Sequence, residues 1–471
     1  MRTAMLVLLL VACAAAATLA NVADVPPRLL AHYVERRAEG HDRVIEDTGR
    51  FVARMLRRVD RGKPVVAGAY PAWAGAARKA PADNVESFTG GRAVTVTTVA
   101  ELRSALDGAL PGDRIVLAPG TYRLSGPPLV LARAGTADKP ILVTAAQLDD
   151  AVVESTLLEG FQVSAPYWTF ENLVVRGVCE RDSDCEHAFH VVGGGRHFTA
   201  RNLVVQDFNA QFKVNGAEGL FPDDGIIERS TLANSRERQT DRPVSPVDIV
   251  AASGWRIEGN LIADFVKAGG DGTSYGVFAK GSAAGTRISR NVVLCEHALH
   301  PDAGRRVGIS LGGGGTDAAY CRDGKCIVEH QAGVLSDNLV AGCSDAGIYL
   351  NRAAQSIVAR NTLLDTAGIE IRFPESVADL EGNLLDGPVR ARDGALVREV
   401  DDRTTPAAWL YAGYHPVRAY FADASQLDLD WRSAPPLRES VTTAAVDLCG
   451  MSRSAHSAYG AFDDIRRCTD H

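Results

Sequence analysis

One short pattern recurs along the middle of the chain: alternating apolar and polar residues lead to an asparagine, and an apolar run follows it. A strand pair with turns that recurs in this way is typical of a solenoid, in which each coil adds core along one axis. Asparagine tolerates left-handed backbone and can hydrogen-bond its neighbours in a ladder. The pattern therefore predicts an all-β chain that folds as a parallel β-helix, whereas an ordinary β-sandwich would have no regular asparagine register. The pattern centres are Asn172, Asn202, Ser230 (in place of asparagine), Asn260, Asn291, Asn338, Asn361 and Asn383.

The length of the chain agrees with a solenoid. Single compact cores stop growing at about 250–300 residues, so 471 residues must form several domains or an elongated repeat. The 45 glycines and the 6% of aromatic residues favour turns and short strands over a helical bundle. We expect a short helical segment and a linker over 21–93, the β-helix over 94–400 and a closing segment over 401–471.

The N-terminus has the features of a secretory signal over residues 1–20, because Arg2 precedes a short apolar run that ends in small residues. The run is too short to span a membrane, and no other stretch is long and apolar enough to do so. We therefore expect an exported protein, periplasmic or extracellular. The alternative is a bacterial lipobox over residues 10–13, which would place a lipid anchor on Cys13.

Eight of the nine cysteines follow the signal segment, an even number that indicates disulfides in an exported chain. Zinc sites usually contain a CxxC spacing, which is missing here. Close spacing in the sequence favours the first two of the disulfides named below. The third would hold the C-terminal tail, and the two remaining cysteines would then form the fourth. The expected disulfides are Cys179–Cys185, Cys321–Cys326, Cys449–Cys468 and Cys295–Cys343.

The formal net charge is −8, and it becomes −9 once Arg2 is removed with the signal segment. This charge argues against a nucleic-acid partner. It still allows a local basic cleft for an acidic polymer.

A second short strand precedes each asparagine segment. Because strand side chains alternate between the two faces, its apolar residues face the core and the others form two outward columns along the solenoid. The first column contains His190, Lys213, Asp248, Phe278, Ser310, Tyr349 and Glu370. The second contains Val192, Asn215, Val250, Lys280, Gly312, Asn351 and Arg372.

These columns combine cations, carboxylates, an aromatic residue and amides, which suits an acidic polysaccharide. Coils stack about 4.8 Å apart, close to the sugar repeat, so a polymer can lie along the columns. Cations would bind uronates or sulfates, tyrosine would stack on a sugar, and asparagine would bind hydroxyls. The plainer interpretation is a solvated charged face.

The chain resembles the secreted right-handed parallel β-helix proteins of the pectate-lyase superfamily. The segment 95–143, with Pro111-Gly-Asp-Arg-Ile-Val-Leu-Ala-Pro-Gly-Thr-Tyr122, is similar to the N-terminal cap of the chondroitinase B and alginate lyase family. The asparagine coils extend the resemblance to about residue 395. The tail from Val446 is similar to the closing segment of many such proteins.

In that family a lysine abstracts the C5 proton of a uronate, an arginine on a nearby coil assists, and calcium held by asparagine and glutamate neutralises the carboxylate. The resemblance places the lysine at Lys280. The next coil reads Ile309-Ser-Leu-Gly-Gly-Gly-Gly315 and lacks the arginine. The calcium-binding pair is not recognisable either, since Asp248 alone is not a calcium cage. No cofactor is therefore required by the residues themselves, and calcium remains the cation that the resemblance implies.

The favoured hypothesis is a lyase that cleaves an acidic polysaccharide by β-elimination, a reaction that needs a cation over the carboxylate and a poised base. We expect a monomer. The candidate catalytic residues are Lys280 or Lys213 as base, Arg372 as carboxylate ligand, and His190 and Tyr349 as proton donors. The candidate substrate-binding residues are Asn215, Asp248, Asn351 and Glu370.

Two alternatives stay open. A glycoside hydrolase would use paired carboxylates, for which Asp223, Asp224 and Asp248 are candidates, although Asp223 and Asp224 first indicate a turn. A non-catalytic envelope or adhesion protein would bind glycan through the same face. The run Gly312–Gly315 favours the second alternative, because it flattens the surface where the arginine is expected.

Overall fold

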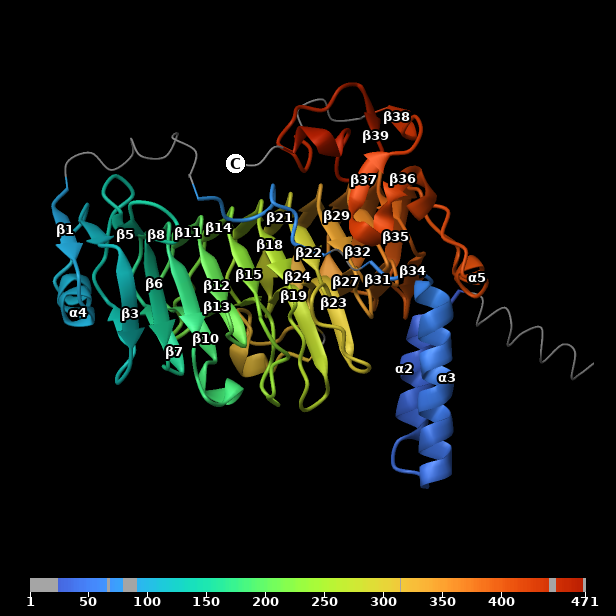
Figure 1. Ribbon diagram of the computed structural model, residues 1–471, viewed down its shortest axis with the longest axis horizontal. Coiled ribbons are helices and arrows are strands. Elements are labelled where there is room, and N and C mark those ends of the chain that lie inside the picture. Colours follow the sequence, from blue (N-terminus) through green and yellow to red (C-terminus); the bar gives the residue numbers. More distant parts are fainter. Residues whose placement is uncertain (1–23, 66–67, 79–90, 314, 440–445, 469–471) are drawn as a thin grey trace, which may run out of the picture.

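The computed structural model describes residues 24–65, 68–78, 91–313, 315–439 and 446–468 (Figure 1). The predicted signal segment 1–20 and Cys13 lie outside these residues.

Three long parallel sheets form the faces of a solenoid, and most coils give one strand to each sheet (Figure 1). The 10-stranded column sheet, which carries the outward columns, contains β4 (Leu129–Leu131), β7 (Glu159–Val163), β10 (His187–Val192), β13 (Ala210–Asn215), β16 (Val247–Val250), β19 (Thr273–Lys280), β23 (Arg305–Leu311), β27 (Ile348–Asn351), β31 (Ile369–Arg372) and β34 (Val389–Arg392). The fold is thus mostly β and is the predicted right-handed parallel β-helix.

The other two faces run alongside it. The 12-stranded sheet contains β1 (Ala93–Val96), β2 (Arg114–Leu117), β5 (Ile141–Ala145), β8 (Trp168–Glu171), β11 (Thr199–Arg201), β14 (Ile226–Glu228), β17 (Arg256–Glu258), β21 (Arg287–Ser289), β25 (Val334–Ser336), β29 (Ser356–Ala359), β32 (Val377–Glu381) and β35 (Leu396–Val400). The third sheet contains β3 (Gly120–Leu124), β6 (Ala151–Ser155), β9 (Val174–Gly177), β12 (Val204–Gln206), β15 (Thr231–Ala233), β18 (Leu261–Ala263), β22 (Val292–Leu294), β26 (Leu339–Ala341), β30 (Thr362–Leu364) and β33 (Leu384–Leu385).

Shorter elements lie at the turns and in the tail. They are β20 (Ala283–Ala284), β24 (His330–Gln331), β28 (Ala353–Ala354), α5 (Ala407–Leu410), β36 (Phe421–Asp423), β37 (Asp428–Trp431), β38 (Leu437–Glu439) and β39 (His456–Ala458), with single 3₁₀ turns at Asp182–Asp184, Ala318–Tyr320, Arg418–Tyr420, Ala424–Gln426 and Ile465–Arg467.

The predicted asparagine ladder is present between the 12-stranded sheet and the third sheet. The Asn291 side chain accepts from both the backbone N–H and the amide of Asn260 at 3.0 Å, and its own amide donates to Asn338 at 3.0 Å. Asn361 and Asn383 continue the series. These five asparagines are 0% exposed, so the ladder satisfies buried donors and acceptors that would otherwise destabilise the fold.

The left-handed residue of this corner differs from the expectation. Asn172 and Asn202 have φ values of 56° and 51°, as predicted. In the later coils the preceding residue takes the left-handed conformation instead, as at Arg290 and Asp337. In these coils asparagine is therefore needed because its side chain both accepts hydrogen bonds from one neighbouring coil and donates to the other, and not because it tolerates a left-handed backbone.

The last rung of the ladder is a carboxylate. Asp402 Oδ1 accepts from the backbone and the amide of Asn383 at 2.7 and 3.0 Å, while its Oδ2 is buried without a partner among the described residues. Burial raises the pKa of Asp402 to about 7.

Stacked phenylalanines set the register of the column sheet from inside. Phe161, Phe189 and Phe212 lie on β7, β10 and β13, with ring centroids 5.1 and 5.0 Å apart and nearly parallel planes. All three are buried. Because each ring sits one residue before an outward position, the stack holds the neighbouring side chains in line.

The two ends of the solenoid are covered. Helix α4 (Val99–Asp107) packs Leu102 and Leu106 on the first coil, and it begins with a capping box of Thr98 and Glu101. The tail lies over the outer side of the third sheet (Figure 1), and the apolar cluster between them includes Val417, Phe421, Leu429, Phe462, Leu261, Val292, Leu339 and Leu364. The column sheet is left free of this cover.

The N-terminal segment forms a helical hairpin of α2 (Pro27–Ala38) and α3 (Arg43–Arg61), which projects from the C-terminal coils (Figure 1). Its base is held by buried charges. Arg28, 1% exposed, donates to Asp60 at 2.5 Å, to Asp365 at 3.0 Å and to the Cys343 carbonyl at 2.8 Å. Arg61 binds the same Asp365 at 2.8 Å. The cations hold the pKa of Asp365 well below its usual range although burial opposes this.

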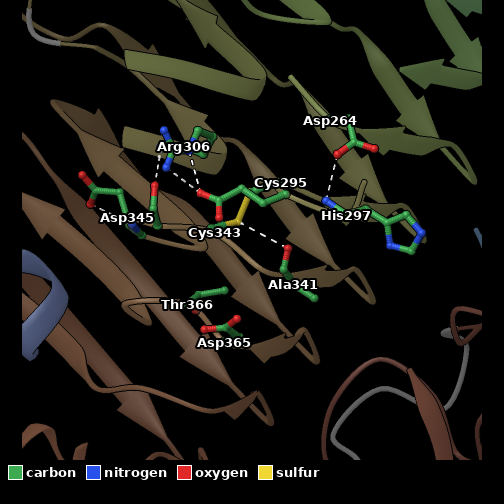
Figure 2. Close-up of a disulfide and its surroundings, with 12 residues drawn as sticks. Asp264, Cys295, His297, Arg306, Ala341, Cys343, Asp345, Asp365 and Thr366 are labelled. Carbon is green, nitrogen blue, oxygen red and sulfur yellow. Dashed lines mark hydrogen bonds and ion pairs between the residues drawn. A yellow bond between two sulfur atoms is a disulfide. The ribbon is translucent and has the colours of Figure 1, made fainter. Parts of the chain in front are cut away.

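All four expected disulfides are confirmed. Cys295–Cys343 joins two coils across 48 residues, and Figure 2 shows it beside Arg306, with Asp365 nearby. Arg306 pairs with Glu296 at 2.6 Å, and both are buried. The disulfide therefore lies next to the charge cluster that anchors the hairpin.

We expect Asn291→Ala to lower the free energy of unfolding by about 2–4 kcal/mol, because it removes one rung and leaves buried donors of Asn260 unpaired. Chemical denaturation monitored by circular dichroism measures this loss. The exposed Gln331→Ala is the control and should behave as wild type. An unchanged unfolding midpoint in Asn291→Ala would show that the ladder does not stabilise the coils.

We expect Asp402→Asn to stabilise the protein more at pH 8 than at pH 5. The folded-state pKa of about 7 lies above the ordinary value of about 3.9, so protonation of Asp402 stabilises the fold. That contribution is complete below about pH 4 and is lost as the pH rises through 7. The difference in unfolding free energy between variant and wild type should grow by about 1–2 kcal/mol between the two pH values. A difference independent of pH would contradict this.

Candidate functional site

The predicted outward columns have the predicted register except at Gly312, which follows the end of β23 and lies outside its strand pairing. In the column sheet His190 pairs with Lys213, Lys213 with Asp248, Asp248 with Phe278, Phe278 with Ser310, Ser310 with Tyr349, and Tyr349 with Glu370. In the second column Val192 pairs with Asn215, Asn215 with Val250, Val250 with Lys280, and Asn351 with Arg372.

Lys213, Asp248 and Lys280 form a basic cluster on β13, β16 and β19. Lys213 Nζ lies 2.5 Å from Asp248 Oδ2, and Lys280 Nζ lies 3.8 Å from Oδ1 of the same carboxylate. The Asp248 side chain is 5% exposed, whereas both lysines are about one-fifth exposed. Burial alone would raise the pKa of Asp248, but the two lysines lower it to about 2. The cluster thus holds two amines beside one buried anion, with net positive charge toward solvent.

The two lysines are held differently. Lys213 is fixed by its direct ion pair with Asp248. Lys280 Nζ lies 3.9 Å above the Phe278 ring centroid, a cation–π distance, and it donates no hydrogen bond to any residue that the structure describes. Lys280 is therefore the freer amine of the cluster.

An apolar step bounds the cluster on its C-terminal side. Phe278 stacks on Tyr275 with centroids 4.1 Å apart and is 7% exposed. Gly313 lies against the same ring, since a Cβ there would be 2.5 Å from it. Gly312 has a left-handed φ of 72°. A Cβ at this position would lie 1.9 Å from the Asn351 carbonyl oxygen, so no side chain fits there. Gly312 and Gly313, the first two residues of the predicted glycine run, thus let the chain pass close to Phe278 and Asn351.

A second polar cluster lies beyond this step, on β27, β31 and β34. The Tyr349 hydroxyl accepts from Asn351 at 2.8 Å and from Arg372 at 3.5 Å. Arg372 also binds Asp393 at 2.8 Å. Burial raises the pKa of Tyr349, so the phenol is protonated at neutral pH.

Glu370 lies in this second cluster as a counter-charge. It accepts from Arg390 at 3.1 Å and from Arg392 at 2.6 Å, and it is 7% exposed. The predicted substrate-binding carboxylate is thus occupied by two arginines within the described structure.

The predicted site residues therefore form two clusters and not one. Lys213, Asp248 and Lys280 converge, whereas Tyr349 and Arg372 lie beyond β19 and β23. Three strand steps from β16 to β27 correspond to about 14 Å. A single sugar cannot contact both clusters, but an extended polymer can.

His190 and Asn215 form a third arrangement at the N-terminal side of the basic cluster. His190 Nε2 lies 2.7 Å from Asn215 Oδ1, and its Nδ1 lies 2.9 Å from Glu159 Oε2. His187 lies beside His190 on β10, with ring centroids 5.2 Å apart. Within the described ranges, Glu159, His187 and His190 are the group of three ligands that could hold a metal ion.

The residues around Asp248 do not fit calcium. Calcium takes six to eight oxygen ligands, whereas Asp248 is already neutralised by two ammonium groups, and no group of three described carboxylates includes it. The calcium that the resemblance implies has no recognisable site at this cluster.

Arg322 is a neighbour of the cluster that the sequence analysis did not find. It lies in the disulfide loop between Cys321 and Cys326, and its backbone N–H donates to the Gly281 carbonyl, directly after Lys280, at 2.9 Å. Its guanidinium binds both oxygens of Asp223 at 2.7 and 2.9 Å. The sequence feature that could have indicated Arg322 is the charged stretch between the closely spaced cysteines Cys321 and Cys326.

The arrangement of Asp223 and Asp224 agrees with a turn. Asp223 is held by Arg322 and accepts from the Ser253 N–H at 2.8 Å, and Asp224 has a left-handed φ of 59°. Neither makes a hydrogen bond or an ion pair with Asp248 in the described structure. The carboxylates expected for a hydrolase are therefore engaged in local structure.

Two further observations concern the surroundings of the protein. None of the helices formed by the described residues has the length and apolar character needed to cross a membrane. The four disulfides fit an exported protein.

The fold, and not the sequence, connects this chain to known proteins. The sequence matches no protein-family model and no curated protein. Among solved structures, the pectate lyase Pel9A matches with a TM-score of 0.55 and 14% identity, over 80% of this chain and 98% of that one.

Two other solved structures match with TM-scores below 0.5. An alginate lyase from Paenibacillus sp. str. FPU-7 has a TM-score of 0.40 and 16% identity, over 66% of this chain and 99% of its own. The A-module of a mannuronan C-5 epimerase from Azotobacter vinelandii has a TM-score of 0.43 and 13% identity, over 67% and 80%. At such identities the match to Pel9A establishes the right-handed parallel β-helix fold and nothing about the chemistry.

Proposed function

We propose that this chain is an exported carbohydrate-active enzyme, a lyase that cleaves an acidic, uronate-containing polysaccharide by β-elimination in the periplasm or outside the cell. The observation that carries the proposal is the basic cluster of Lys213, Asp248 and Lys280 on the outward columns. The resemblance to the chondroitinase B and alginate lyase family supports the same class of reaction, and the fold is one that a solved pectate lyase also has.

The cluster supplies the two groups that β-elimination requires. The C5 proton of a uronate is weakly acidic, so a cation must stabilise the charge that develops on the carboxylate. Lys213, fixed as an ammonium by its 2.5 Å contact with Asp248, binds that carboxylate. Lys280, which faces Asp248 as an ammonium, first releases its proton to solvent, and the neutral amine is then the base that removes the C5 proton.

The elimination balances within this cluster. The C5–H bond breaks and its electron pair forms the C4–C5 double bond, while the C4–O bond breaks with its pair on the departing oxygen. The ammonium formed on Lys280 returns the proton to that oxygen. Asp248 keeps both lysines in place and takes no part in bond making.

The second cluster binds another part of the same polymer. Tyr349 and Asn351 lie three strand steps from Asp248, about 14 Å along the solenoid, and Arg372 lies four steps away, about 19 Å. These distances place them several sugars away. Arg372 and its neighbours Arg390 and Arg392 supply positive charge for further carboxylates. His190 remains a candidate proton donor only for a sugar at the N-terminal side of the cluster.

Lys280→Ala should reduce the formation of unsaturated uronate by at least about 100-fold, the usual contribution of a positioned base, with binding of the polymer nearly unchanged. Ultraviolet absorbance of the product measures the rate with alginate, chondroitin, dermatan, pectate and hyaluronate as substrates. Lys139→Ala, an exposed lysine at the N-terminal end of the solenoid, is the matched control.

The outcomes separate the classes of function. No absorbance from folded wild-type protein on any of these polymers would contradict the lyase proposal for them. New reducing ends without absorbance would indicate a glycoside hydrolase. Glycan binding without turnover, unchanged in Lys280→Ala, would indicate a non-catalytic envelope or adhesion protein.

Arg372→Ala should raise KM for long oligosaccharides about 5- to 10-fold, the order expected for one lost charge-assisted contact, and should leave kcat unchanged. Oligosaccharides too short to reach the second cluster should show no change in either constant. Kinetics on a size-fractionated series make the comparison. An equal loss with short and long substrates would place Arg372 at the reacting sugar.

A further inference from the structure

Three potential metal ligands meet on two adjacent strands at the N-terminal side of the basic cluster. Glu159 lies on β7 directly opposite His187 on β10. His190 lies three residues further along β10, with its ring centroid 5.2 Å from that of His187. Nδ1 of His190 is 2.9 Å from Glu159 Oε2, and Nδ1 of His187 is 3.6 Å from Oε1. One ligand atom from each residue lies within 4.8 Å of the others.

The neighbouring asparagine fixes which nitrogen of His190 faces this point. The Asn215 amide nitrogen donates to the Gly216 carbonyl at 3.1 Å, so its oxygen faces His190. His190 Nε2 at 2.7 Å must then carry the proton and donate it. The Nδ1 lone pair is left facing the carboxylate of Glu159, and two acceptors at 2.9 Å repel unless a proton or a metal ion lies between them.

His187 offers a second unused nitrogen. Its Nδ1 is buried and has no hydrogen-bond partner in the described structure, although it points toward the same carboxylate. An orphaned buried acceptor or donor destabilises a fold by about 1–3 kcal/mol, and a bound cation would remove that penalty.

No described lysine or arginine neutralises this carboxylate. Lys213, the neighbour of His190 in the next strand, is drawn to Asp248 at 2.5 Å. The side chains of Glu159, His187 and His190 are 24%, 13% and 14% exposed. The site is therefore enclosed on most sides but reachable from solvent.

We propose that Glu159, His187 and His190 bind a divalent transition-metal ion of the zinc type. Two imidazoles and one carboxylate are donors that zinc prefers, at about 2.0–2.2 Å each. Ligands at these lengths around a tetrahedral ion lie about 3.3 Å apart, and one ligand atom from each of the three residues lies within 4.8 Å of the others, so small side-chain shifts would bring them to an ion. Calcium, which takes oxygen ligands only, does not suit this set.

Three protein ligands leave one position open for water or for an anionic oxygen. The site lies on the same outward column as Lys213, one strand away. A carboxylate of an acidic ligand in the open position would thus lie beside the basic cluster. The metal site itself does not depend on the proposed lyase activity.

Metal binding to the full-length chain tests the proposal. After treatment with a chelator, titration with Zn²⁺ in a calorimeter or against a chromophoric chelator should give one ion per chain with a micromolar or lower Kd. Co²⁺ in its place should give visible absorption bands typical of a four-coordinate site with nitrogen ligands. Excess Ca²⁺ should displace neither ion.

Variants assign the ligands. His187→Gln, His190→Gln and Glu159→Gln should each weaken Zn²⁺ binding by at least 10-fold, and Asn215→Leu, which releases His190, should weaken it by about 10-fold. His300→Gln, an exposed histidine outside the group, is the matched control and should bind as wild type.

Some outcomes would overturn the proposal. They are no Zn²⁺ bound by folded wild-type protein, or ligand variants that bind as tightly as the control. If a ligand variant does not fold, X-ray absorption on the Zn²⁺-loaded wild type decides, since a spectrum without two imidazole ligands contradicts the assignment. All of these measurements are independent of polysaccharide cleavage, so failure of one proposal leaves the other standing.

Discussion

The register between successive coils is the constraint on which the rest of this structure depends. A parallel sheet places every outward residue beside the corresponding residue of the next coil, so a slip of one residue would turn the lysines of the columns into the core. Two buried series prevent the slip. The asparagine ladder links the corner of each coil to the next, and the stack of Phe161, Phe189 and Phe212 fixes the column sheet from inside.

The chemistry of the surface follows from that alignment. Lys213, Asp248 and Lys280 come from three coils that are far apart in sequence, yet they lie side by side because their strands are neighbours. The same rule brings Glu159 to His187 and His190, and Tyr349 to Arg372. Each group is a short row across strands, and Phe278 with Gly313 divides the rows. The polar side chains described on the column sheet thus form separate groups along one axis.

The fold and the columns could be predicted from the sequence because both depend on periodic patterns. Asparagine spacing, alternation along strands and the pairing of close cysteines are local signals, and the register deduced from apolar positions is the register observed. The distance between Lys280 and Tyr349 could not be predicted in this way. The alignment gives the order of the residues along the solenoid, but it does not say which of them are close enough to act together. Arg322 and Glu159 were missed for a related reason. One reaches the site from an inserted disulfide loop, and the other lies on a strand before the first asparagine segment that the alignment included.

The anchor of the N-terminal hairpin has a consequence for the order in which the molecule assembles. Arg28 and Asp365 are 337 residues apart in sequence, and Arg61 and Asp365 are separated by 304. Emerging from a ribosome or a translocation channel N-terminus first, the hairpin meets neither Asp365 nor Glu296 until most coils have been made. Coils can stack on their immediate predecessors as they appear, since their contacts are between neighbours. The N-terminal hairpin therefore emerges early but can dock only after the C-terminal coils of the solenoid have formed.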